Sequence, residues 1–328
     1  MSRVFSGIQP SGELHVGNYL GAVKNWVALQ DRHQCLFCIV DLHAVTQPYE
    51  AAELEQRTLD MAAGLLAAGL DPQKCTIFVQ SHVAEHTMLA WVLNTVTPLG
   101  ELERMTQFKD KSARLESVPA GLLNYPVLQA ADILLYRADR VPVGEDQLQH
   151  LELAREIARR WNARYGVEYF PEPQPMLSRA TRIAGLDGQA KMSKSVGNTI
   201  GLLERPEIIW EKLRPAMTDP ARKTKKDPGT PELCNIYRLH QFFSSADEVA
   251  TVSDRCRSAG WGCLDCKRVL ADNMIAALAP VRERAAAFQA RPGHVRDVLA
   301  TGAARARALA RETLGDVGRI MGFLPPAV

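Results

Sequence analysis

Short apolar runs alternate with longer amphipathic stretches along the first half of this chain. The apolar runs at residues 3–6, 35–40 and 76–79 are short enough to be buried strands. Amphipathic stretches with helical spacing lie between them, at residues 15–30 and 51–68. This order of strand, helix, strand and helix predicts a parallel sheet with crossover helices, and so an α/β fold.

The pattern continues with a helix predicted at residues 121–136, a strand at residues 140–143 and a long helix that ends near Tyr165. In a parallel sheet the ligand crevice lies beyond the carboxyl ends of the strands. The segments that follow the first three strands should therefore converge there: residues 7–18, 41–44 and 80–82.

A second domain is predicted to begin near residue 186. Prolines at residues 171–175 and glycines at residues 185–188 mark a boundary, and the chain beyond it is charged and has helical periodicity. We expect a Rossmann-like parallel-sheet domain over residues 1–185 and a smaller all-helical domain over residues 186–291.

Composition adds modest constraints. The chain has 328 residues, of which 46% are hydrophobic, so two units can each bury a core. The 39 basic and 37 acidic residues leave a net charge of +2, which by itself does not indicate a nucleic-acid partner. A basic cluster at residues 222–226 and eight arginines after residue 280 give weak support for one. The chain has neither a long apolar run nor an N-terminal leader, so we expect no membrane span and a cytoplasmic location.

Two short motifs indicate nucleotide chemistry. Residues 191–195, KMSKS, place two ammonium groups and two hydroxyls on one loop, a combination suited to gripping a triphosphate. Residues 15–18, HVGN, follow a glycine-rich turn and open a predicted helix, whose N-terminus favours anions. Each motif alone could be an ordinary surface loop. The two together predict a nucleotide site.

In this order the two motifs resemble the HIGH and KMSKS signatures of class I aminoacyl-tRNA synthetases. Residues 5–12, 101–109, 130–134 and 143–147 resemble blocks of the bacterial tryptophanyl-tRNA synthetases, so the resemblance covers nearly the whole chain. It implies an enzyme that activates L-tryptophan with ATP and then charges tRNA(Trp). It also implies that residues 186–291 carry the KMSKS loop and bind the anticodon, and that residues 292–328 pack back on the sheet domain.

The resemblance assigns ATP contacts to both motifs and to two turns. The implied residues are Gln9, Ser11, Gly12, His15, Gly17, Asn18, Gly144, Asp146, Lys191, Met192, Ser193, Lys194 and Ser195. Among these, Lys191 and Lys194 would reach the leaving pyrophosphate, and Lys111 would be a further catalytic lysine on the phosphates. Mg²⁺ should accompany ATP, although the sequence shows no dedicated carboxylate cage for it.

We expect the helix at residues 121–136 to recognise the amino-acid substrate. Tyr125, Gln129, Asp132 and Tyr136 lie along one of its faces. An ionised Asp132 only accepts hydrogen bonds, so it favours a substrate with an N–H donor, such as an indole. The alternative is that Asp132 only caps the helix or forms a salt bridge.

The family's tryptophan-binding positions correspond to Phe5, Gly7, Gln9, Tyr125, Gln129, Asp132, Val143 and Gln147. Phe5 and Val143 would form apolar walls, whereas Tyr125, Gln147 and Gln9 would hold the amino and carboxylate groups. Gln129 stands where many members have Met, which leaves its role open. Two alternatives remain: a tyrosyl-type ligase, which Phe5 disfavours because tyrosine enzymes present a phenol-reading tyrosine there, and a paralogue that activates tryptophan without charging tRNA.

The seven cysteines divide into two groups. Cys35, Cys38 and Cys75 lie in or beside predicted strands, so we expect buried structural thiols. The others, Cys234, Cys256, Cys263 and Cys266, follow a C-x₂₁-C-x₆-C-x₂-C spacing that fits zinc or a four-iron cluster equally well, unless they are unconnected thiols.

This spacing resembles a subset of the bacterial tryptophan enzymes that carry a structural [4Fe-4S] cluster, although its first interval is one residue shorter. The family also implies a homodimer, whose interface would include residues 101–111.

Overall fold

The computed structural model describes residues 2–177, 183–190, 192 and 196–325. The chain divides into two compact units. The sheet unit is formed by residues 1–12, 25–178 and 291–328, and the helical unit by residues 13–24 and 179–290. In the described part of the chain, no helix is long and apolar enough to cross a membrane.

The sheet unit is built on five parallel strands. These are β1 (Arg3–Ile8), β2 (Gln34–Ile39), β3 (Thr76–Val79), β4 (Arg140–Val143) and β5 (Gln174–Leu177). Their order in the sheet is β3-β2-β1-β4-β5, with every recorded pairing parallel. This is a doubly wound arrangement, so the predicted Rossmann-like α/β fold is confirmed.

The sheet unit also contains helices and short turns. They are α2 (Lys24–Leu29), α3 (Asp41–Ala44), α4 (Ala51–Ala67), the 3₁₀ turn η2 (Gln80–His82), α5 (Glu85–Asn94), α6 (Leu99–Arg104), α7 (Thr106–Ser112), α8 (Ala120–Leu134), the 3₁₀ turn η3 (Glu145–Gln147), α9 (Leu148–Tyr165) and α14 (Pro292–Met321). The predicted helices at residues 51–68 and 121–136 correspond closely to α4 and α8.

The central strands are buried because they are apolar on both faces. Residues 35–39 of β2 are all buried, as parallel strands covered by helices require. Phe37 of β2 stacks on Trp26 of α2, with ring centroids 4.8 Å apart. Cys35, Cys38 and Cys75 are buried here as free thiols, as the strand pattern predicted. Burial raises the pKa of Cys35 and of Cys75 to about 12, so both remain neutral and unreactive.

The strand β5 was not predicted, because Pro171–Pro175 was interpreted as a boundary. Pro175 is in fact paired with Val141 of β4. Proline is tolerated here because β5 is an edge strand, where the missing amide proton costs no ladder bond on the open side.

The strand order changes direction between β1 and β4, and in doubly wound sheets ligands bind beyond the carboxyl ends of the strands at such a point. Gly7 lies near the end of β1, where an added Cβ would be 2.8 Å from Cγ1 of Val40. Glycine thus allows β1 and the end of β2 to approach closely at this edge.

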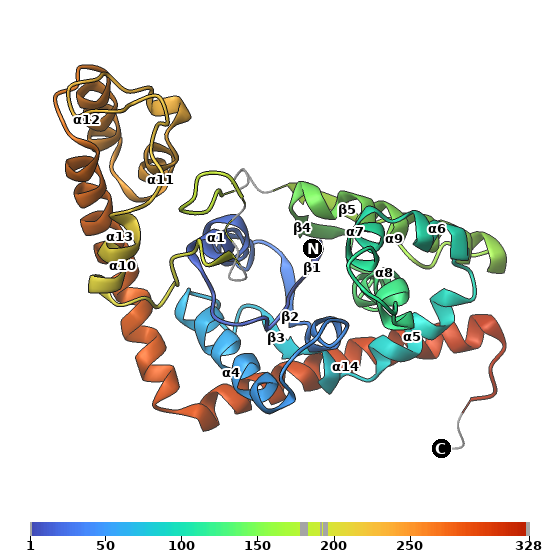
Figure 1. The fold of residues 1–328 in the computed structure, drawn as a ribbon. Helices are drawn as coiled ribbons and strands as arrows, with labels where there is room; N and C mark the ends of the chain where they lie inside the picture. The colour runs from blue at the N-terminus through green and yellow to red at the C-terminus, as the bar shows by residue number, and fades with distance from the viewer. Residues whose placement is uncertain (1, 178–182, 191, 193–195, 326–328) are drawn as a thin grey trace. The chain divides into compact units, whose positions relative to one another are not determined.

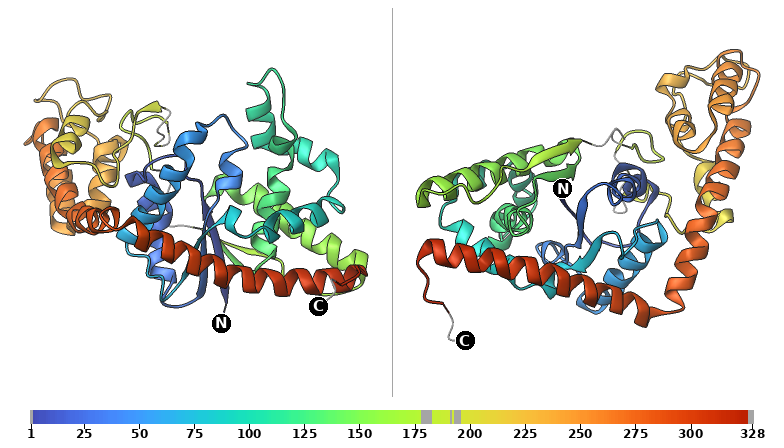
Figure 2. Two further views of the ribbon diagram at one scale, coloured as in Figure 1. Left: turned by 90° about the horizontal axis from the view of Figure 1, so that it is seen from below. Right: turned by 180° about the vertical axis from the view of Figure 1, so that it is seen from behind.

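The helix α14 covers the outer edge of β3. It packs on β3 and on the flanking helices α4 and α5, and Figures 1 and 2 show it in red along this side of the sheet. Gly302 makes the approach possible, because an added Cβ would lie 1.8 Å from the carbonyl oxygen of Ile77. The exposed backbone of an edge strand is thereby shielded.

The helical unit begins with α1 (Val16–Asn18) and a π-helical turn, η1 (Tyr19–Val23), and continues with α10 (Pro206–Leu213), a 3₁₀ turn η5 (Pro231–Leu233), α11 (Asn235–Phe243), α12 (Ala246–Arg257) and α13 (Cys263–Gln289). The long α13 packs on α10 and α11. Lys267 of α13 is buried, and its ammonium donates to the carbonyls of Arg214 and Ala216 at 2.8 and 2.7 Å. These bonds satisfy carbonyls at the end of α10.

Replacing Gly302 with Ala should destabilise the sheet unit. The new methyl group would collide with the backbone of β3 rather than with a flexible side chain, so we expect a loss of about 3 kcal/mol in the free energy of unfolding. Gly315→Ala on the same helix is a matched control, because nothing lies within 4 Å of its Cβ. This control should be neutral or stabilising by about 1 kcal/mol. Denaturant unfolding measures both, and equal stability of the two variants would contradict the close-packing argument.

Candidate active site

The sheet unit holds most of the predicted site residues. Those at the strand ends and on the neighbouring helices are Phe5, Gly7, Gln9, Ser11, Gly12, Lys111, Tyr125, Gln129, Asp132, Val143, Gly144, Asp146 and Gln147. Phe5 and Gly7 belong to β1, whereas Val143 and Gly144 come at the end of β4. The structure thus collects these residues at the carboxyl edge of the sheet and on α7 and α8.

Asp132 of α8 is a buried carboxylate with three donors. Its Oδ1 accepts from Nε2 of Gln80 at 2.7 Å and lies 2.6 Å from Nδ1 of His86. Its Oδ2 lies 2.8 Å from Nε2 of His43. Burial alone would raise the pKa of Asp132, but hydrogen bonds from His43 and His86 and electrostatic attraction to both rings lower it to about 2. Asp132 is therefore ionised at neutral pH.

A carboxylate offers roughly four lone-pair positions to donors. Two are used on Oδ1, and among the described residues one is used on Oδ2, by His43. One position on Oδ2 therefore has no hydrogen-bond donor among the described residues. The orientation of Gln80 is also fixed, because its Oε1 accepts from the amide of Leu42 at 3.1 Å and its Nε2 then faces Asp132.

No motif in the sequence indicates these donors, because a lone His or Gln carries none. His43 lies in α3 after β2, Gln80 begins η2 after β3, and His86 lies in α5. The first two come from the segments at residues 41–44 and 80–82, which the strand pattern placed at the carboxyl edge of the sheet. The sequence thus located the segments without assigning their side chains.

Tyr125, a second polar residue of α8, belongs to another network. Its hydroxyl lies 2.8 Å from Nε2 of His150 and 3.3 Å from Oε1 of Gln107. Nζ of Lys111 lies 5.0 Å from the centre of its ring, a cation–π contact. Burial lowers the pKa of Lys111, and burial followed by the charge of Lys111 lowers that of His150 to about 4. His150 is therefore a neutral imidazole beside a cation.

The turn after β4 is tightly closed. Gly144 is the N-cap of η3, and an added Cβ would lie 2.7 Å from Oδ1 of Asp146. Nε2 of Gln147 donates to Oδ2 of Asp146 at 3.1 Å. Asp146, predicted to contact ATP, and Gln147, predicted to contact tryptophan, are thus hydrogen-bonded neighbours on this turn.

The predicted nucleotide motif at residues 15–18 lies in the helical unit. The His15 ring accepts from the amide of Asn18, and the Asn18 side chain accepts from the amide of His15, both at 3.3 Å. The amide of Val16 donates to the carbonyl of Ile200 at 2.9 Å, and an isolated antiparallel bridge pairs His15 with Gly201.

Part of the second predicted motif lies beside the first. An added Cβ at Gly17 would be 2.9 Å from Nδ1 of His15 and 3.1 Å from Cβ of Met192, so Gly17 packs closely against Met192. Two segments far apart in the sequence therefore meet within the helical unit. The predicted Lys191, Ser193, Lys194 and Ser195 lie outside the described residues.

Cys234, Cys256, Cys263 and Cys266 all line one small cavity of about 20 Å³ in the helical unit. Burial raises the pKa of Cys266 to about 12 and also raises the pKa values of Cys234 and Cys256. Within the described ranges, no three His, Cys, Asp or Glu side chains stand close enough together to hold a metal ion. The structure gathers the four thiols without showing a coordination sphere.

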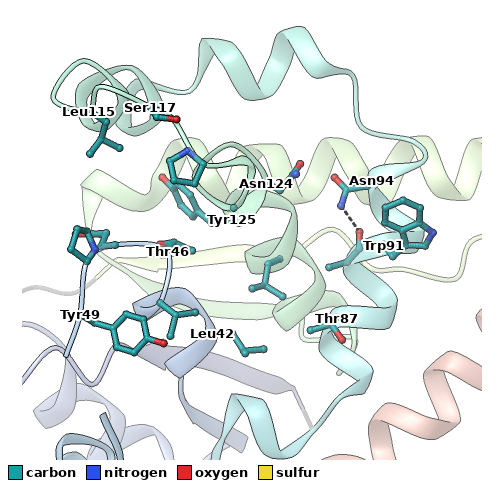
Figure 3. Close-up of a pocket in the computed structure, with 17 residues that line it drawn as sticks. Leu42, Thr46, Tyr49, Thr87, Trp91, Asn94, Leu115, Ser117, Asn124 and Tyr125 are labelled. Carbon is teal, nitrogen blue, oxygen red and sulfur yellow. Dashed lines mark hydrogen bonds between the residues drawn. The ribbon is translucent and has the colours of Figure 1, made fainter. Parts of the chain in front are cut away.

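A larger cavity of about 730 Å³ opens on the sheet unit. Figure 3 shows side chains of α3, α5 and α8 around it, including Leu42, Trp91 and Tyr125. Of the described residues predicted to hold tryptophan, Tyr125 alone is among those that line it. Trp91 is 72% exposed, which is unusual for so large an apolar side chain. The sequence analysis did not predict this cavity.

A doubly wound parallel sheet and a helical unit in one chain are consistent with a class I synthetase. Residues 1–279 match the family described as tRNA synthetases class I (W and Y), and the chain belongs to that family.

Similar proteins extend this finding to the whole chain. The tryptophan–tRNA ligase of Deinococcus radiodurans is 55% identical over 329 residues, covering 99% of each protein. The tryptophan–tRNA ligase of Parasynechococcus marenigrum is 49% identical, covering 98% of each. The crystal structure of the Campylobacter jejuni tryptophanyl-tRNA synthetase complexed with ADP and tryptophan has a TM-score of 0.89 and 37% identity, covering 98% of this chain and 100% of that one.

The stability of the sheet unit should depend on pH through His150. Unfolding restores its ordinary pKa of 6.5, whereas the folded value is about 4, so the unfolded chain binds the proton first as pH falls. The free energy of unfolding should therefore be undiminished above pH 6.5 and fall by about 2 kcal/mol between pH 7 and pH 5 from this group alone. His150→Gln should flatten that decline, and His82→Gln, at an exposed position, should not. Denaturant unfolding at the two pH values provides the measurement, and an unchanged slope for His150→Gln would refute it.

Proposed function

We propose that this member of the family is a tryptophan–tRNA ligase. The carboxylate of L-tryptophan attacks the α-phosphorus of ATP, the bond to the β-phosphate oxygen breaks, and pyrophosphate leaves. A hydroxyl at the 3′ end of tRNA(Trp) then attacks the carbonyl of the adenylate, and AMP leaves. Full-length similarity to tryptophan–tRNA ligases, at up to 55% identity, is the observation that carries the proposal. The substrates ATP and tRNA are consistent with a cytoplasmic enzyme.

In this proposal Asp132 accepts a hydrogen bond from the indole N–H of tryptophan. A substrate N–H donor is the partner that the remaining position on Oδ2 needs, because an ionised carboxylate cannot donate. A tyrosine hydroxyl can also donate, so Asp132 alone does not separate the two substrates of this family. The first strand distinguishes the two substrates, because Phe5 has no polar group that could pair with the hydroxyl of tyrosine.

The other proposed tryptophan contacts surround this acceptor. Phe5 and Val143 form apolar walls, and Gly7 leaves room beside β1. Tyr125, Gln147 and Gln9 hold the amino and carboxylate groups. Tyr125 is held in place for this role by hydrogen bonds with Gln107 and His150 and by the cation–π contact with Lys111. Gln129 lies on the same helix and has no assigned contact.

ATP is proposed to bind the residues that the family resemblance assigns to it. In the sheet unit the assigned residues are Gln9, Ser11, Gly12, Gly144 and Asp146, with Lys111 on the phosphates. In the helical unit they are His15, Gly17, Asn18 and residues 191–195, of which Lys191 and Lys194 stabilise the leaving pyrophosphate. Mg²⁺ accompanies the nucleotide, held mainly by phosphate oxygens and water.

An activation assay with each proteinogenic amino acid tests this function. We expect tryptophan to support ATP–pyrophosphate exchange and tRNA(Trp) charging far better than any other amino acid. Tyrosine in first place would establish the tyrosyl-type alternative, and exchange without charging would establish a non-charging paralogue.

Asp132→Asn should raise the KM for tryptophan about tenfold or more while changing the KM for ATP little, because an amide is a weaker acceptor than a carboxylate. The control Asp316→Asn removes a carboxylate that accepts from Tyr169 and should leave both KM values unchanged.

The helical unit is proposed to bind the anticodon of tRNA(Trp). Its basic residues include Arg222, Lys223, Lys225 and Lys226, and Lys223, Lys225 and Lys226 are exposed. Positive charge of this kind contacts phosphates and positions an RNA without reading its sequence.

The four cysteines are proposed to hold a structural [4Fe-4S] cluster, with zinc as the alternative. Their convergence on one cavity supports the proposal, as does their chemistry, because four thiols are a complete ligand set for either centre. The arrangement described is not a coordination sphere, so the thiols must turn toward a common centre when the metal binds. Cys234, Cys256, Cys263 and Cys266 would then cross-link the start of α11 with α12 and α13. The bound group would stabilise this region of the helical unit and take no part in the adenylation step.

Metal analysis of anaerobically purified protein distinguishes these possibilities. A four-iron cluster gives a brown protein with about four irons per chain, whereas zinc gives a colourless protein with about one metal ion. Cys263→Ser should lose the metal and impair tRNA charging more than tryptophan activation, because the loss loosens the helical unit. The control Cys75→Ala, in the sheet unit, should keep the metal. Neither iron nor zinc in protein prepared without oxygen would show that the four thiols are unconnected.

Homodimers are typical of this family, and the sheet unit offers an apolar surface for one. Met88 and Trp91 of α5 and Leu99 of α6 are 49%, 72% and 58% exposed. The predicted interface segment, residues 101–111, begins beside them. Glu101 in this segment pairs with Arg160 of the same chain, which neutralises part of its charge. We expect two copies of this chain to associate through this face.

A further inference from the structure

Tyr136 and His86 form a hydrogen-bonded chain behind Asp132. The Tyr136 hydroxyl lies 2.8 Å from Nε2 of His86, whose Nδ1 lies 2.6 Å from Oδ1 of Asp132. All three residues are almost completely buried, with 0%, 0% and 1% exposure. Neither Tyr136 nor His86 has a part in the proposed contacts with substrate.

The two hydrogen bonds of His86 fix the orientation of its ring. Burial raises the pKa of Tyr136, so its hydroxyl keeps the proton and can donate to Nε2 while Nδ1–H donates to the carboxylate. A flipped ring would turn carbon atoms toward both partners and leave two buried polar groups unpaired. Such unpaired groups are costly, so one ring orientation is strongly favoured.

His86 in turn fixes the orientation of the carboxylate. With Gln80 and His86 both on Oδ1, the plane of the Asp132 carboxylate cannot turn without breaking a bond. His43 occupies one side of Oδ2, so the remaining position points in a single direction. The orientation of the Asp132 carboxylate thus depends on Gln80, His86 and His43.

We propose that His86 and Tyr136 are positioning residues that set the selectivity for the indole N–H by holding the Asp132 carboxylate in place. The inference rests on the proposed role of Asp132 and extends it to a residue pair with no assigned function.

Tyr136→Phe isolates the hydroxyl. The ring of Tyr136 stacks on Phe5, with centroids 5.6 Å apart, and meets Phe78 edge to face at 5.7 Å. Phenylalanine keeps both aromatic contacts and removes only the oxygen. Tyr169→Phe is the matched control, because its hydroxyl lies 2.9 Å from Oδ2 of Asp316 in the same unit.

The probe is an analogue of tryptophan in which sulfur replaces the indole N–H, β-(benzothiophen-3-yl)alanine. The measured quantity is the ratio of kcat/KM for tryptophan to that for the analogue in pyrophosphate exchange. We expect Tyr136→Phe to lower this ratio by roughly threefold to tenfold, the effect of one hydrogen bond. The lower ratio should come from a higher KM for tryptophan in Tyr136→Phe. The kcat/KM for the analogue and the KM for ATP should not change. Tyr169→Phe should leave the ratio at its wild-type value.

A double-mutant cycle tests whether Tyr136 acts through His86. His86→Asn places an amide N–H near the position of Nδ1 but ends the chain to Tyr136. Its ratio should therefore lie below that of the wild type, and adding Tyr136→Phe should lower it no further. Independent, additive effects of the two substitutions would overturn the relay, even if Tyr136→Phe alone lowers the ratio.

The outcomes separate this inference from the function on which it rests. If the wild type does not prefer tryptophan to the analogue, the role of Asp132 is wrong and the relay with it. If the wild type prefers tryptophan and Asp132→Asn abolishes the preference, but Tyr136→Phe leaves it unchanged, the function stands and the relay is overturned. A reduced ratio for Tyr136→Phe, lost in the His86→Asn background, supports it.

Discussion

An ionised carboxylate inside a protein requires donors for nearly all of its lone pairs, and this requirement organises the edge of the sheet. Asp132 draws its donors from three separate segments, after β2, after β3 and in α5. Because a parallel sheet brings the carboxyl ends of its strands to one edge, segments that are distant in sequence can meet around a single side chain. The fold therefore supplies the donors that keep Asp132 charged.

Much of this arrangement follows from the sequence. The apolar runs and amphipathic stretches predicted four of the five strands and the parallel sheet, and they placed residues 41–44 and 80–82 at the same edge as Asp132. Periodicity could not supply the partners of Asp132, since which donor faces which oxygen depends on tertiary packing. His43, Gln80 and His86 have no motif. Tyr136 was predicted only to share a face of the helix at residues 121–136, and in the structure it follows the end of α8 at Leu134. The strand β5 was missed because proline is compatible with an edge position that the sequence does not reveal.

The two nucleotide motifs were likewise only partly predictable from the sequence. Their residue types predicted the chemistry, but the contact of Gly17 with Met192 and the bridge of His15 to Gly201 join segments about 180 positions apart. Such a pairing has no local signal. For the four cysteines the spacing suggested a shared site, and the fold does bring all four to one cavity.

The covering of β3 by α14 has a consequence for synthesis of the protein. The sheet unit is discontinuous, since residues 291–328 complete a structure begun by residues 1–12. While the ribosome is still translating α13, the edge of β3 has no covering helix, and its unpaired amides and carbonyls can pair with other chains. The sheet unit is therefore completed last, after the helical unit has been translated in full. A chain released before residue 302 would lack the glycine that lets α14 reach the strand, and would expose a sheet edge prone to aggregation.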